Sequence, residues 1–101
     1  MSLEKYITKY KGTITFNSLT HLDFGLATVE VIDWLKEDLL QVEFDNNQLL
    51  DIGWYPEFNI DGHFTVQLIA DYNWETPLFK ENCCTFKSLE DTVIKALNYL
   101  K

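Results

Sequence analysis

The sequence predicts an α+β fold in which an antiparallel meander sheet of about five to six strands carries one C-terminal helix on one face. Several short segments alternate apolar and polar residues, and turn residues follow closely after them. The last segment instead has apolar residues at helical spacing. Consecutive strands with short links pair as a meander, and a helix must bury its apolar stripe against the sheet.

Three strands are expected in the first half of the chain. Residues 13–16 alternate, and the β-branched run 27–34 predicts a second strand. The third strand, 40–44, has an apolar residue at every second position, which indicates one buried and one wet face. The turn residues at 45–47 should end it.

Three more strands are expected in the second half. Residues 50–54 place Leu50, Ile52 and Trp54 on one face, and Pro56 should end this strand because proline cannot donate to a sheet ladder. A turn then leads into an alternating strand at 64–68 that can pair with it as a hairpin. A less regular strand is predicted over 78–86.

The C-terminal segment is the helix of this prediction. Ser88 is a suitable N-cap residue, and Asp91 stands three residues later in a weak capping box. The apolar residues that recur at helical spacing are Leu89, Val93, Leu97 and Leu100.

The length and composition indicate one folded domain over residues 1–101. Hydrophobic residues make up 47% of the chain, which is too apolar for intrinsic disorder. No apolar run has the length of a signal peptide or a membrane span, so we expect a cytoplasmic protein. The neighbouring Cys83 and Cys84 fit a reducing compartment, because adjacent strand residues point to opposite faces and rarely form a disulfide.

The charge is concentrated in the middle of the chain. Sixteen acidic residues face eight lysines and no arginine, and residues 21–75 hold twelve of the acids with Lys36 alone. Nucleic acid and anionic membranes are therefore poor partners, since both need clustered cations. A basic protein fits, because complementary charge steers its approach. The alternative is that the charge only keeps the protein soluble.

The sequence offers no recognisable catalytic set, so we predict a protein that is not an enzyme and uses no cofactor or metal. His21 and His63 lack metal-ligand spacing, and no nucleophile elbow or phosphate-binding loop occurs. An enzyme that uses paired carboxylates remains an alternative, because with sixteen acids some pair could support acid–base chemistry.

Two segments combine aromatic rings with carboxylates. In DIGWYPEFNIDGHF, Trp54 and Tyr55 fall on opposite strand faces, so one ring must point away from the core. In IADYNWETPLF, Tyr72 and Trp74 stand among acids. Such rings are typical anchors of protein interfaces, although many rings of a small domain belong to its core.

These two segments, within residues 50–80, resemble a group of small bacterial immunity proteins of contact-dependent growth inhibition systems. The resemblance implies a cytoplasmic protein that binds and neutralises one cognate toxin domain, commonly a nuclease. We expect this protein to be a monomer or weak dimer. A nuclease is basic around its substrate groove, so an acidic inhibitor can occupy that groove. An acidic adaptor or regulatory module without a toxin partner is the alternative.

The partner-binding residues that we predict are acids for charge pairing and two rings for burial. They are Asp33, Glu37, Asp38, Glu43, Asp45, Trp54, Glu57, Asp61 and Trp74.

Overall fold

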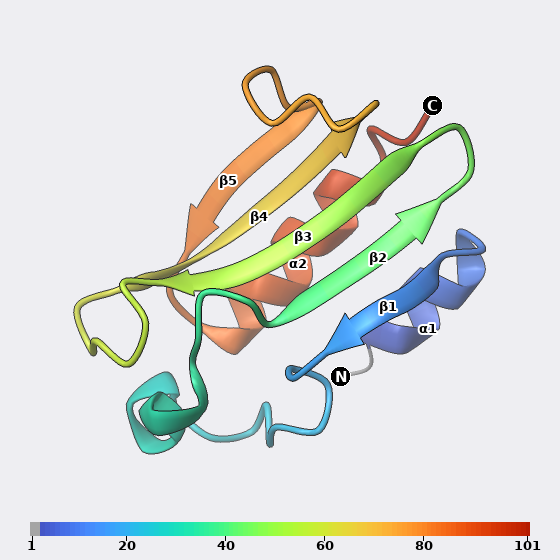
Figure 1. Ribbon diagram of the computed structural model, residues 1–101. Helices are drawn as coiled ribbons and strands as arrows, with labels where there is room; N and C mark the ends of the chain where they lie inside the picture. The colour runs from blue at the N-terminus through green and yellow to red at the C-terminus, as the bar shows by residue number, and fades with distance from the viewer. Residues whose placement is uncertain (1–2) are drawn as a thin grey trace.

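A computed structural model of the chain, which describes residues 3–101, has a five-stranded antiparallel sheet with both of its α-helices on one face (Figure 1). The strands pair in sequence order, β1-β2-β3-β4-β5, so the predicted meander and α+β class are confirmed. The elements in chain order are α1 (Leu3–Lys9), β1 (Thr13–Asn17), the 3-10 helix η1 (Thr28–Trp34), β2 (Leu40–Phe44), β3 (Gln48–Tyr55), β4 (His63–Ala70), β5 (Phe79–Cys83) and α2 (Phe86–Leu97).

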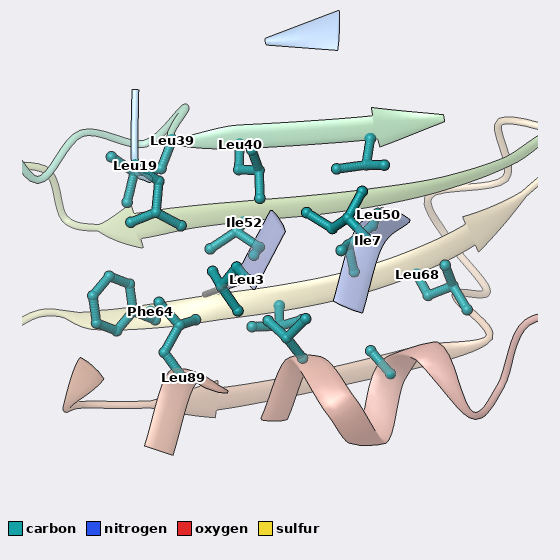
Figure 2. Close-up of a cluster of buried hydrophobic side chains, with 14 of the residues drawn as sticks. Leu3, Ile7, Leu19, Leu39, Leu40, Leu50, Ile52, Phe64, Leu68 and Leu89 are labelled. Carbon is teal, nitrogen blue, oxygen red and sulfur yellow. The ribbon is translucent and has the colours of Figure 1, made fainter. Parts of the chain in front are cut away.

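The core lies between the sheet and the helices. Cross-strand register builds continuous apolar rows on this face, as where Val42 pairs with Leu50 and Leu50 with Leu68. The helices complete the core with Leu3 and Ile7 from α1 and with residues such as Leu89 from α2 (Figure 2). Burying one such leucine or isoleucine side chain contributes about 1.5–3 kcal/mol, so these rows hold the layers together.

The second predicted strand, over 27–34, is wrong, because this segment forms η1. The sheet has no place for the strand, since β1 pairs directly with β2. A side-chain oxygen of Glu30 accepts a hydrogen bond from the backbone N–H of Ala27 at 2.8 Å, which closes the first helical turn. Val31 and Leu35 are buried, so this segment contributes to the core although it adds no strand to the sheet.

The C-terminal helix is confirmed, but it begins two residues before the predicted cap. Thr85 is its N-cap: the Thr85 hydroxyl accepts from the Ser88 backbone N–H at 3.0 Å, and the Ser88 hydroxyl accepts from the Thr85 N–H at 3.1 Å. Phe86, predicted at the end of the last strand, therefore opens the helix, and β5 ends at Cys83.

Helix α1 is an addition to the predicted fold. It covers seven residues and buries only Leu3 and Ile7, so its sequence shows one apolar pair and no sustained helical repeat. It lies on the same face of the sheet as α2.

Candidate functional site

The face of the sheet turned away from the helices, called here the open face, carries a row of polar side chains. The strand register aligns Gln41 with Asp51 and Asp51 with Gln67. It also pairs Tyr55 with His63 across β3 and β4. A shallow hollow of about 310 Å³ lies on this face; its lining residues are Tyr55, His63, Thr65, Gln67, Lys80 and Asn82.

Asp51 is an acid buried in the middle of the open face. It is only 5% exposed, although its strand face has no helix over it. Its Oδ1 accepts a hydrogen bond from Nε2 of Gln41 at 3.1 Å. Burial raises the pKa of Asp51, the hydrogen bond from Gln41 opposes this, and the nearby charge of Asp38 raises the pKa further. The carboxylate is therefore held in place at an electrostatic cost.

Tyr55 and a backbone carbonyl flank Asp51 on the same strand face. A Cβ atom at Gly53 would collide with the carbonyl oxygen of Glu37 and would lie 2.9 Å from Cε2 of Tyr55. Only glycine therefore lets both groups lie over this position. Burial raises the pKa of the Tyr55 hydroxyl, and the charges of Asp51, Asp38 and Glu37 raise it further. The charges of three carboxylates thus act on one tyrosine hydroxyl.

One end of the sheet collects carboxylates from two separate loops. This acidic end consists of η1, residues 35–39 and residues 56–62, which lie next to each other at the same end of the sheet (Figure 1). One backbone hydrogen bond joins its two loops, from the Phe58 N–H to the Leu35 carbonyl at 2.9 Å. A second, from the Trp54 N–H to the Lys36 carbonyl at 2.8 Å, fixes residues 35–39 to strand β3. Its predicted partner-binding residues are all exposed: Asp33, Glu37, Asp38, Glu57 and Asp61.

Large apolar side chains are exposed at the same end. Trp34 is 60% exposed, Phe58 47% and Ile60 64%. None of the five carboxylates has an ion-pair partner within residues 3–101, and Lys36 is the single cation of these loops. Carboxylates without ion-pair partners, next to exposed rings and aliphatic side chains, are typical of a protein-binding surface.

The other predicted acids and rings lie elsewhere. Glu43 is exposed on the open face, at the far end of β2 from the acidic end. Asp45 belongs to the β2–β3 turn and Trp74 to the β4–β5 connection, at the opposite end of the sheet (Figure 1). These two loops are joined there, since the Asp71 N–H donates to the Asn47 carbonyl at 2.9 Å.

The prediction that Trp54 anchors a partner is wrong. Its ring is 1% exposed and packs edge-to-face on Phe64, with ring centroids 4.9 Å apart. Its Nε1–H donates to the Asn59 carbonyl at 2.9 Å, so the polar atom of the indole is also satisfied inside the protein. Tyr55, the next residue, is the ring that points away from the core.

Sequence reasoning missed five residues of this region. Trp34, Phe58 and Ile60 were not selected. Phe58 and Ile60 stand in a segment rich in turn formers, where apolar residues have few core positions to fill, whereas Trp34 lies in the segment that was predicted as a strand. The sequence pattern points more clearly to Asp51 and Tyr55 as residues of the open face. They alternate with the apolar residues of β3 and so had to lie on the opposite face.

Other site chemistries find little support in the part of the chain that the structure describes. Within residues 3–101, no three His, Cys, Asp or Glu side chains are grouped so that they could hold a metal ion. Cys83 and Cys84 are free thiols, and burial raises the pKa of the Cys83 thiol, which disfavours the reactive thiolate. Among the helices of residues 3–101, none has the length and apolar character needed to span a membrane.

Comparisons with protein-family models, with curated proteins and with solved structures found no match for this chain. The assignment of function therefore depends on the geometry and charge of the surface described above.

Proposed function

We propose that this protein is an immunity protein that binds a cationic toxin domain, with a nuclease as the expected toxin, and neutralises it as a stoichiometric complex. One observation carries the proposal: six exposed carboxylates and four exposed large apolar side chains lie together at the acidic end, which has Lys36 as its single cation. They are the five predicted acids with Glu30, and the side chains of Val29, Trp34, Phe58 and Ile60. A basic partner would neutralise this charge, and the rings would be buried at the contact.

The arrangement supports binding at the acidic end more than at the opposite end. Two loops contribute carboxylates here, and hydrogen bonds to the buried residues Leu35 and Trp54 hold both loops. Such a surface is largely formed before binding, which lowers the entropy cost of association.

The test is co-expression with the protein encoded immediately upstream of this chain. A purified one-to-one complex that weakens with salt, together with rescue of cells from the upstream protein, is the expected result. A toxic upstream protein that neither binds this chain nor is neutralised by it would overturn the proposal. If the upstream protein is harmless and another basic protein binds the acidic end, the protein is an adaptor instead.

A matched pair of variants locates the interface in that complex. Asp33→Lys with Glu57→Lys changes two exposed acids of the acidic end, and Glu75→Lys with Asp91→Lys changes two exposed acids away from it. Both variants shift the net charge by the same amount. We expect the first variant to lose the complex and the second to keep it.

A further inference from the structure

The hollow of about 310 Å³ on the open face presents a cation and neutral hydrogen-bond donors. Strands β3, β4 and β5 build it, since the register places Tyr55 beside His63 and places Gln67 beside Lys80. None of its six lining residues within the described chain is an acid, although the chain has sixteen. Three other hollows of residues 3–101 each include acidic side chains, among them Asp23, Glu43 and Asp45.

Lys80 is the cation of this hollow. Its side chain is exposed and forms no ion pair within residues 3–101. The next residue, Glu81, falls on the opposite face of β5 and pairs with Lys95 of α2 at 3.6 Å. Asp51 stands two strands from Lys80, with Gln67 between them in the same row, and is only 5% exposed. The charge of Lys80 is therefore available to a ligand.

A hydrogen bond between two lining residues positions a neutral donor near Lys80. The hydroxyl of Thr65, a residue that is only 6% exposed, donates to Oδ1 of Asn82 at 2.9 Å. Because Oδ1 already accepts this hydrogen bond, the amide nitrogen Nδ2 of Asn82 is the part that can donate to a ligand, and it has no acceptor within residues 3–101. The Tyr55 hydroxyl can donate as well, because burial and nearby carboxylates raise its pKa and keep it protonated at neutral pH.

A group with one negative charge and two acceptor atoms matches this lining. A carboxylate can accept from a lysine ammonium and from a neighbouring amide or hydroxyl at the same time. The net charge of −8 repels anions at longer range, and this repulsion costs a doubly charged phosphate more than a carboxylate. The volume of the hollow and the Tyr55 ring leave room for a small apolar body attached to the carboxylate.

We propose that this hollow binds a carboxylate, with the Lys80 ammonium as its charge partner and the Asn82 amide as a neighbouring donor. The other lining side chains that can donate to it are those of Gln67, His63 and Tyr55. The carboxylate can belong to a small molecule or to an acidic residue of a protein. Its binding requires no toxin, so the purified protein alone tests it, and the result is separate from that for the proposed function.

The first experiment is an NMR titration with benzoate and with benzamide, its neutral analogue, at constant ionic strength. Benzoate should give saturable shifts in the side-chain amide signals of Gln67 and Asn82. Benzamide should give none at equal concentration, because it lacks the charge that pairs with Lys80. Equal binding of the two compounds, tighter binding of inorganic phosphate than of benzoate, or shifts that avoid the hollow would overturn the proposal.

Two variants that each remove one positive charge locate the site. Lys80→Gln should weaken benzoate binding about tenfold or more, because a charge-assisted hydrogen bond is lost. Lys87→Gln, on α2 and so across the sheet from the hollow, should leave the affinity within about twofold of the original protein. Both lysines are exposed and form no ion pair within residues 3–101, so the fold should tolerate either change. Equal weakening by the two variants would mean a general charge effect and would overturn the site.

A peptide probe identifies the source of the carboxylate. Acetyl-Gly-Glu-Gly-amide carries the carboxylate of a protein side chain, and the same peptide with glutamine is its neutral control. Binding of both benzoate and the glutamate peptide would support a site for any accessible carboxylate, including that of a protein. Binding of benzoate alone would support a site for a small molecule. Binding of neither probe would overturn the proposal.

Discussion

Asp51 is a residue whose burial works against the fold. An acid with a raised pKa in the folded state binds its proton more tightly there than in the unfolded chain. The electrostatic cost is absent at low pH, where Asp51 is protonated in both states. It develops as the pH rises through the folded-state pKa, so the charged form destabilises the protein at neutral pH.

Asp51→Asn should therefore stabilise the protein at neutral pH. Asparagine has nearly the same shape and can still accept the hydrogen bond from Gln41, but it carries no charge to desolvate. Urea unfolding across a pH series should show a gain in unfolding free energy that shrinks as the pH falls. A variant that is less stable than the original protein at neutral pH would contradict the assigned cause of the pKa shift.

Gly53 is the residue that lets the Glu37 carbonyl and the Tyr55 ring lie directly over β3. Gly53→Ala should cost about 1–3 kcal/mol of unfolding free energy, because the added methyl group meets the Glu37 backbone and cannot be avoided by a side-chain rotation. Gly25→Ala is the matched control, since its added methyl group would meet only the Asp23 side chain, at 3.1 Å. Equal small effects in denaturant titrations would contradict this packing.

At the scale of elements, the start of α2 depends on a reciprocal cap. Thr85→Ala should lower the unfolding free energy by about 1 kcal/mol, because it removes the hydroxyl that accepts from the first turn of the helix. Asp91→Ala should change it by less than about 0.5 kcal/mol, since Asp91 is exposed and takes no part in the cap. Thermal or urea unfolding of both variants measures the difference.

Strands β2, β3 and β4 could be predicted from the sequence because a period of two is a local property. Leu50, Ile52 and Trp54 reveal their shared face without any knowledge of the neighbouring strands. The segment 27–34 misled because Val29 and Val31 alternate, whereas the decisive fact is that β1 already occupies the edge beside β2. This pairing joins segments that are distant in the chain, so the local sequence of 27–34 does not indicate it.

The candidate site was less predictable than the fold for a related reason. The acidic middle of the sequence correctly indicated that Asp33 and Glu57 are exposed, but these residues lie 24 positions apart in the chain. They share one end of the protein because the loops after Leu35 and Tyr55 are hydrogen-bonded to each other. Trp54 and Trp74 stand in similar local sequence, and only the packing of the sheet buries one and exposes the other.

In the whole molecule, the apolar core lies on one face of the sheet, and carboxylates lie on the other face and at one end. The helices cover one face of the sheet (Figure 1), and the apolar rows pack there. The open face and the acidic end hold carboxylates that form no ion pair within residues 3–101. A field of this kind raises the rate of encounter with a basic partner, and salt screens it. An acidic binding surface should therefore affect the rate of association as well as the affinity.

The most direct test is the rate of association with the upstream protein, measured by stopped-flow over a range of salt concentrations. We expect fast, salt-sensitive association for the original protein and for the variant Glu75→Lys with Asp91→Lys. Asp33→Lys with Glu57→Lys should associate about tenfold or more slowly at low salt, with a flatter salt dependence. Equal rates and equal salt slopes for the two variants would contradict the acidic end as the binding surface.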